Sequence, residues 1–80
     1  MTKAQIFDIV KKNIVEVLPD LDQDMIALDK SLSDLGANSV DRMEIIQMSM
    51  DELSVNIPLM SFAKATNIDG VVEVLLANRR

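Results

Sequence analysis

Residues 35–46 read LGANSVDRMEII, and this stretch combines a bend, two polar residues and the start of an amphipathic helix. Gly36 has the backbone freedom that a tight bend before a helix requires. Asn38 and Ser39 are both favoured N-caps, because their side-chain oxygens accept hydrogen bonds from free backbone N–H groups. We therefore expect a helix over about residues 39–53, entered through a bend at Gly36.

This helix has two different faces when residues are placed at 100° intervals. One face is expected to pack in the core and holds Ile45, Ile46, Ser49 and Leu53. The opposite face holds Val40, Met43, Glu44, Gln47, Met50 and Asp51. An ordinary solvated face would carry less apolar surface than this second face does. We expect it to dock partners, because methionines adapt to several apolar grooves and acids steer toward basic patches.

The residues before this stretch predict one more helix and a long loop. Thr2 and Gln5 fit a capping box, and apolar residues recur at helical spacing up to Pro19, which disfavours continuation. The first helix should therefore span about residues 3–18. Residues 19–38 follow as a long loop, a feature that is uncommon in compact domains and often functional. Its apolar residues should pin it to the core: Met25, Ile26, Leu28, Leu32 and Leu35.

The residues after this stretch predict two shorter elements. Pro58 is well placed at the first turn of a short helix over residues 59–64. Thr66 or Asn67 then caps a last helix, whose apolar face holds Ile68, Val71, Val72, Leu75 and Leu76 and whose negative end suits Arg79 and Arg80. Three β-branched residues, Val71, Val72 and Val74, leave a strand as the alternative there. The pattern predicts one all-α domain over residues 1–80, an up-and-down bundle of three main helices and one short helix.

The composition excludes several function classes. The chain of 80 residues has a net charge of −5, which disfavours binding to nucleic acid or to anionic membranes. It contains neither Cys nor His, so a thiol nucleophile, the commonest general base and the commonest zinc ligand are missing. No apolar run approaches the length of a membrane span, and the N-terminus lacks the apolar region of a signal peptide. We expect a cytoplasmic protein with no metal site that is not itself an enzyme.

Two motifs with possible chemistry fail on inspection. Asp20, Asp22 and Asp24 begin like a calcium-binding loop, but Met25 and Ser31 stand where the EF-hand needs Gly and Glu. A solvated acidic loop is the simpler interpretation. A serine nucleophile would need a His or Lys base, and neither a His nor an S-x-x-K motif is present.

Ser39 is open to two interpretations when its residue type and position are considered alone. It could be a plain N-cap, which is a common role for serine. It could instead carry an attached group, and a helix N-terminus would stabilise the negative charge of an attached phosphate.

The stretch LGANSV, in an acidic chain of this length and layout, resembles the acyl carrier protein family, whose usual motif is L-G-x-D-S-L. The resemblance covers essentially the whole chain. It implies that Ser39 carries 4′-phosphopantetheine, whose thiol holds acyl groups as thioesters, and that partner enzymes perform all catalysis. A phosphopantetheinyl transferase would attach the group from coenzyme A. The family is usually monomeric, so a monomer is expected.

Two positions depart from the family motif. Asn38 replaces the usual Asp, so a charge near the metal of the modifying transferase is lost, and Val40 replaces the usual Leu. Arg42 is also unusual, because a cation in the first turn opposes the helix dipole by about 0.3–1 kcal/mol. Arg42 either pairs with a neighbour such as Asp34 or helps one partner enzyme to discriminate this carrier from others.

The run NSVDRMEI is most similar to free-standing carriers of polyketide β-branching cassettes. This resemblance implies an acetyl thioester delivered to a hydroxymethylglutaryl-CoA (HMG-CoA) synthase-like enzyme, with an acyltransferase and a ketosynthase or decarboxylase as further partners. Docking would use Val40, Asp41, Arg42, Met43, Glu44, Gln47, Met50 and Asp51. A carrier for fatty acid synthesis, or for other polyketide, peptide or aminoacyl units, is the alternative. A helical interaction module without any attached group is the alternative of another class.

A cavity that shelters an acyl chain is also known in the family. The candidate lining residues are Ile45, Ile46, Met48, Ile57, Met60, Phe62 and Ile68. Plain core packing is expected to account for most of them, and a carrier of acetyl groups would hardly need a cavity.

Overall fold

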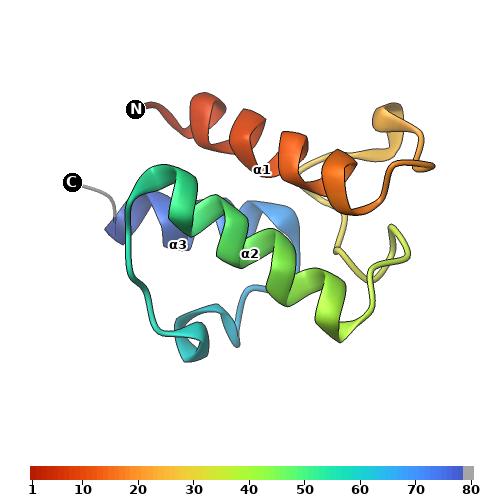
Figure 1. Cartoon of the computed structure of the whole chain (residues 1–80). Helices are drawn as coiled ribbons and strands as arrows, with labels where there is room; N and C mark the ends of the chain where they lie inside the picture. The colour runs from red at the N-terminus through yellow and green to blue at the C-terminus, as the bar shows by residue number, and fades with distance from the viewer. Residues whose placement is uncertain (79–80) are drawn as a thin grey trace.

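The computed structural model of the chain describes residues 1–78, and all of its regular elements are helical (Figure 1). Its elements, in chain order, are α1 (Lys3–Val17), the 3₁₀ turn η1 (Gln23–Met25), α2 (Ser39–Leu53), the 3₁₀ turn η2 (Leu59–Phe62) and α3 (Ile68–Asn78). No strand occurs in this part of the chain. The prediction of an all-α fold is therefore confirmed, and the strand alternative for the last element is wrong.

The predicted bounds differ little from the observed ones. The bounds of α2 are as expected, and α1 ends one residue earlier than predicted. The short element η2 is a single 3₁₀ turn of four residues, shorter than the expected helix over 59–64. The expected arginines at the end of the last helix, Arg79 and Arg80, lie outside the described residues.

Local hydrogen bonds explain where the helices begin. Thr2 Oγ1 accepts a hydrogen bond from the Gln5 backbone N–H at 3.2 Å, and Gln5 Oε1 accepts one from the Thr2 N–H at 2.8 Å. This is the predicted capping box of α1. At the start of α3, Asn67 Oδ1 accepts a hydrogen bond from the Gly70 N–H at 2.8 Å. Of the two cap candidates, Asn67 therefore supplies the side-chain cap.

The other two α-helices, α2 and α3, both pack against α1. In Figure 1, α2 and α3 both run in the direction opposite to that of α1. This is the arrangement expected of an up-and-down bundle whose third member is the short element. The connection over residues 54–67, which includes η2, carries the chain back across the molecule before α3 begins, so the predicted bundle is confirmed.

A single aliphatic core lies between the helices. Its buried members on the helices are Ile6, Val10, Ile14, Ile45, Met50, Leu53, Ile68, Val71, Val72 and Leu75. Phe62 from η2 and Ile57 before it also contribute buried side chains. With only two aromatic residues in the chain, burial of aliphatic side chains supplies the main driving force for folding.

The long loop between α1 and α2 is held to the core by four of the five residues expected to do so. Ile26, Leu32 and Leu35 are buried, and Leu28 is half-buried and packs against the core. Met25 is about half exposed, so its predicted role in pinning the loop is wrong. Met25 is the last residue of the 3₁₀ turn η1, a surface turn whose own residues are all exposed.

Backbone hydrogen bonds tie this loop to the start of α3 and to α2. The Ile68 N–H donates to the Lys30 carbonyl and the Asp69 N–H donates to the Leu28 carbonyl, both at 2.9 Å. Just before α2, Gly36 has φ of +95°, a backbone conformation that favours glycine. The loop, the beginning of α2 and the beginning of α3 are thus fixed relative to one another.

Candidate functional site

Ser39 is the first residue of α2 and is exposed to solvent. The cap of the helix is the preceding residue, Asn38, whose Oδ1 accepts a hydrogen bond from the Asp41 N–H at 2.8 Å. The Asp41 carboxylate completes the capping box by accepting from the Asn38 N–H at 3.2 Å. Because Asn38 performs the capping, the hydroxyl of Ser39 is not needed for it and remains available for chemistry.

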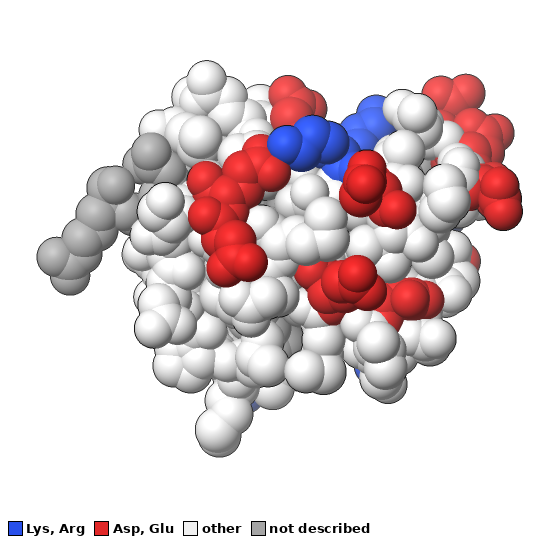
Figure 2. Space-filling model, viewed as in Figure 1, with Lys and Arg blue, Asp and Glu red and all other residues white. Residues whose placement is uncertain are grey.

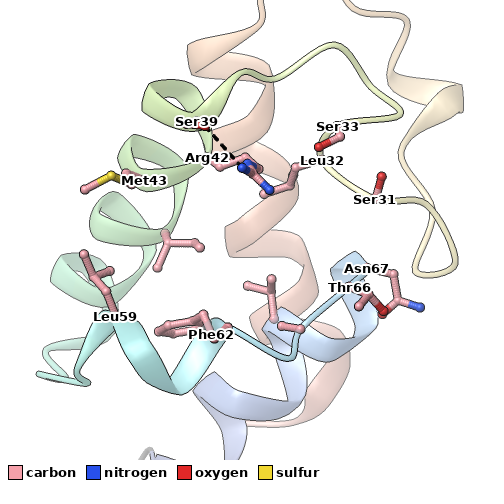
Figure 3. Close-up of a pocket in the computed structure, with 14 residues that line it drawn as sticks. Ser31, Leu32, Ser33, Ser39, Arg42, Met43, Leu59, Phe62, Thr66 and Asn67 are labelled. Carbon is pink, nitrogen blue, oxygen red and sulfur yellow. Dashed lines mark hydrogen bonds between the residues drawn. The ribbon is translucent and has the colours of Figure 1, made fainter.

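Arg42 lies one turn after Ser39 and points back toward it. Arg42 Nη2 donates a hydrogen bond to Ser39 Oγ at 3.3 Å, as the dashed line in Figure 3 shows. The alternative pairing with Asp34 is not formed. Asp34 instead joins a local turn, in which its carboxylate accepts a hydrogen bond from the Ser31 N–H at 3.2 Å.

A pocket of about 570 Å³ opens beside Ser39 and Arg42. Its walls come from α2, η2, the end of the long loop and the start of α3 (Figure 3). The apolar lining includes Leu32, Met43, Ile46, Leu59, Phe62 and Val71. Polar side chains also line it, namely Ser31, Ser33, Thr66 and Asn67. The pocket can therefore accept a chain that carries both hydrogen-bonding groups and apolar segments.

The pocket uses only two of the predicted cavity residues, Ile46 and Phe62. Ile45, Ile57 and Ile68 are buried in the core, as the alternative of plain packing proposed. Met48 is half-buried and does not line the pocket, and Met60 is 87% exposed on the outside of η2. The loop and α3 residues of the pocket were not predicted, because their positions depend on the hydrogen bonds between the long loop and α3.

Most of the predicted docking residues on α2 are on the surface. Val40 is 70% exposed and Met43 is 54% exposed, which is unusual for side chains of this size and hydrophobicity. Arg42, Glu44, Gln47 and Asp51 are exposed, and Asp41 is half-buried beside its cap partner. Gln47 Nε2 donates a hydrogen bond to Asp51 Oδ1 at 3.1 Å, so these two polar side chains are paired across one turn.

Met50 contradicts the prediction that it belongs to the docking face. It is 2% exposed and packs in the core. The physical reason is its position at the border of the two faces: it follows Ile46 by four residues and precedes Leu53 by three. A long, flexible thioether side chain at such a border turns inward to fill the space between helices.

Two exposed apolar residues that were not predicted to dock partners lie on η2. Leu59 is 43% exposed and Met60 is 87% exposed. Together with Val40 and Met43 they make up four of the six large hydrophobic side chains exposed over residues 1–78. Their exposure could have been predicted from the apolar pair directly after Pro58, because a four-residue turn cannot bury all of its side chains.

The molecule is predominantly acidic on the face that includes α2. Figure 2 shows this face with many more Asp and Glu side chains than Lys and Arg side chains. In the whole sequence, 13 acidic residues stand against eight basic ones. Over residues 1–78, none of the helices is long and apolar enough to cross a bilayer.

Comparison with known proteins gives a family match. The family described as "Phosphopantetheine attachment site" matches residues 8–75. The polyketide biosynthesis acyl-carrier-protein AcpK of Bacillus subtilis is 44% identical over 75 residues, which is 94% of this chain and 92% of that protein. An acyl carrier protein of Campylobacter lari is 37% identical over 71 residues, which is 88% of this chain and 91% of that protein.

A solved structure agrees with these relatives. A chain in the crystal structure of the curacin biosynthetic pathway HMG synthase in complex with acetyl donor-ACP aligns with a TM-score of 0.88 and 40% identity. The alignment covers 96% of this chain and 99% of that chain, so the match is to the small carrier and not to the synthase. The two chains therefore share the whole fold. The chain belongs to the acyl carrier proteins, which hold acyl groups on phosphopantetheine and are carriers rather than catalysts.

Proposed function

We propose that this chain is the acetyl-donor carrier of a polyketide β-branching cassette, with 4′-phosphopantetheine attached to Ser39. In this role it presents an acetyl thioester to an HMG-CoA synthase-like enzyme, which condenses the acetyl unit with a β-ketoacyl chain. The observation that carries the proposal is the match, at 40% identity over nearly all of both chains, to the acetyl-donor carrier in complex with the curacin HMG synthase. The similarity to a polyketide carrier of Bacillus subtilis supports it.

The geometry around Ser39 fits a phosphopantetheine arm. Ser39 is exposed, its hydroxyl is not used for capping, and the residue lines the 570 Å³ pocket. The arm would supply the thiol that this cysteine-free chain lacks. Arg42 is a cation beside the position of the phosphodiester, and the polar lining residues Ser31, Ser33, Thr66 and Asn67 could pair with amides of the arm.

The exposed surface around Ser39 fits docking to partner enzymes. We propose a docking surface that extends over α2 and η2 and comprises Val40, Met43, Glu44, Gln47, Asp51, Leu59 and Met60. Its apolar members can enter partner pockets, while its carboxylates attract basic patches. Asp41 and Arg42 lie at its edge next to Ser39. The phosphopantetheinyl transferase, the HMG-CoA synthase-like enzyme, the acyltransferase and the ketosynthase or decarboxylase are the proposed partners of a monomer that acts in the cytoplasm.

The first experiment is intact-mass spectrometry after incubation with coenzyme A, Mg²⁺ and a promiscuous phosphopantetheinyl transferase. We expect one phosphopantetheine on the wild-type protein and none on Ser39→Ala, since the hydroxyl oxygen is the attacking atom. Ser33→Ala is the matched control, because Ser33 also lines the pocket and is exposed but does not begin a helix. Modification of Ser39→Ala, or a folded wild type that gains no mass, would instead favour another attachment residue or an unmodified interaction module.

The second experiment separates a β-branching carrier from a carrier for fatty acid synthesis. The acetylated protein is incubated with an HMG-CoA synthase-like enzyme of a polyketide pathway and a β-ketoacyl acceptor carrier, and product is measured by mass. The Campylobacter lari acyl carrier protein, loaded in the same way, serves as the matched control. We expect product with this chain and at least about tenfold less with the control. Equal rates with the two carriers would support a general carrier role.

A further inference from the structure

Arg42 is a cation for which no carboxylate partner is found in the part of the chain that the structure describes. The ion pairs over residues 1–78 all involve lysines: Lys3 with Asp69 and Glu73, and Lys12 with Glu52. The side chain of Arg42 is instead directed at the hydroxyl oxygen of Ser39, with Nη2 3.3 Å from Oγ. Five N–H groups of a guanidinium are donors, and the contact with Ser39 uses one nitrogen.

The position of Arg42 is electrostatically unfavourable in the unmodified protein. It lies in the first turn of α2, where the helix dipole favours negative charge. The nearby Asp41 carboxylate is engaged in the capping box with Asn38. An additional anion next to Ser39 would therefore be stabilised by Arg42 without displacing an existing ion pair.

The hydrogen bond to Ser39 Oγ defines which anion can reach the guanidinium. When a phosphate is joined to that oxygen, the phosphorus atom is one covalent bond from the atom that Arg42 already contacts. The non-bridging phosphate oxygens then lie within reach of the same side chain. Planar guanidinium groups bind such oxygens through paired N–H donors. Hydrogen bonds from a guanidinium to an anionic oxygen are stronger than the present bond from the guanidinium to an uncharged hydroxyl.

The location of the guanidinium also determines the direction in which an arm attached to Ser39 would begin. Arg42 lines the pocket together with Leu32 and Ser33 of the long loop, and in Figure 3 its side chain extends from α2 toward these residues. Val40, by contrast, is 70% exposed and is not part of the pocket lining. A phosphate held by Arg42 would therefore start the arm on the pocket side of Ser39.

We propose that Arg42 is an intramolecular phosphate-binding residue, which pairs with the phosphodiester on Ser39 and directs the attached arm along the pocket between α2 and the long loop. This inference rests on the proposed attachment at Ser39. Arg42 is a positioning residue in this role, since it acts on the carrier's own prosthetic group. The interaction forms within one chain and does not need a partner enzyme.

The test compares modified and unmodified forms of the wild type, Arg42→Gln and Arg42→Lys. Lys11→Gln is the charge-matched control, because Lys11 lies on α1, which does not line the pocket. Intact mass first confirms the modification, so failure of the attachment proposal is recognised before Arg42 is tested. The measurements are the ³¹P resonance of the phosphodiester, the NMR signals of the Arg42 side chain and the unfolding equilibrium constant at low ionic strength.

We expect the Arg42 Nε–H signal to shift on modification and the ³¹P resonance of modified Arg42→Gln to differ from that of the wild type. Modification should lower the unfolding equilibrium constant of the wild type and of Lys11→Gln about two- to fivefold more than that of Arg42→Gln, as expected for an exposed ion pair. Arg42→Lys should retain part of this difference, because it keeps the charge but not the planar pair of donors.

One result would overturn the proposal: a ³¹P resonance and a modification-dependent stability that are the same in wild type and Arg42→Gln. If the affinity of Arg42→Gln for an HMG-CoA synthase-like enzyme falls at the same time, Arg42 would be assigned to recognition of the partner.

Discussion

Asn13 of α1 donates a buried hydrogen bond to Ser49 of α2, with Nδ2 and Oγ 3.0 Å apart. Ser49 in turn donates to the Ile45 carbonyl at 2.8 Å, so its hydroxyl links two partners. Asn13 and Ser49 are the two buried polar residues found over residues 1–78. This linked pair joins the helix that begins with Ser39 to the rest of the core, and it fixes the register of α1 against α2.

We expect Ser49→Ala to lower the free energy of unfolding by about 1–3 kcal/mol, because the amide of Asn13 would remain buried without its acceptor. A double-mutant cycle with Asn13→Ala measures the interaction itself by urea denaturation. The double variant should be more stable than the sum of the single losses predicts, with a coupling of about 0.5–3 kcal/mol. Additive losses, equal within about 0.5 kcal/mol, would show that the hydrogen bond contributes nothing specific.

The two methionines Met43 and Met50 should respond in opposite ways to truncation. Met50→Ala removes a buried side chain and should lower the free energy of unfolding by about 2–5 kcal/mol. Met43→Ala removes an exposed side chain on the same helix and should change it by no more than about 0.5 kcal/mol. Urea denaturation of the two variants is the measurement. Similar effects of the two substitutions would contradict the assignment of Met50 to the core.

The contrast between these methionines shows what the sequence could and could not predict. Long helices repeat their pattern over four turns, so the bounds of α2 and the core positions of Ile45 and Leu53 could be predicted from periodicity. Met50 lies at the border of two faces, where the helical period does not determine whether a side chain is buried or exposed. A flexible side chain at such a position turns toward whichever side has space. Tertiary packing around α2 settles its orientation.

The parts of the site that lie near Ser39 in the sequence could be predicted, whereas those from the long loop could not. Asn38 and Arg42 act within one turn of Ser39, so their spacing of one and three residues already places them beside it. The serines Ser31 and Ser33 join the pocket only because the long loop is hydrogen-bonded to the start of α3. No local pattern encodes such a contact between distant segments, which is why these lining residues were not predicted.

Lys3 connects α1 to α3 and gives stability a defined dependence on pH. Its Nζ lies 2.6 Å from Asp69 Oδ1 and 2.7 Å from Glu73 Oε1. The hydrogen bond with Asp69, and then that with Glu73, raises the pKa of the Lys3 amine above its ordinary value. A raised pKa in the folded state means that the contribution is fully present below the unfolded-state pKa of about 10.4 and is lost as pH rises through the folded value.

We therefore expect Lys3→Met to be slightly less stable than the wild type near neutral pH, with a difference that disappears at alkaline pH above the folded-state value. Both carboxylates are partly exposed, so the difference should be small and should shrink as salt is added. Urea denaturation across a pH series measures it, with Lys11→Met as the control. A difference that is constant across the alkaline range would mean that packing of the lysine stem, and not its charge, is responsible.

Met60 provides the sharpest test of the proposed docking surface, because it is almost fully exposed and contributes little to the fold. Met60→Ala should leave the free energy of unfolding within about 0.5 kcal/mol of the wild type. If the side chain enters an apolar pocket of the partner, the same substitution should raise the Kd for an HMG-CoA synthase-like enzyme about fivefold or more, as truncation of an interface anchor does. Met25→Ala is the matched control, since Met25 is also exposed but lies in η1 on the long loop. Isothermal titration calorimetry with the modified carrier compares the three proteins. No loss of affinity for Met60→Ala would exclude η2 from the docking surface. Equal losses for Met60→Ala and Met25→Ala would show that the effect is not specific to η2.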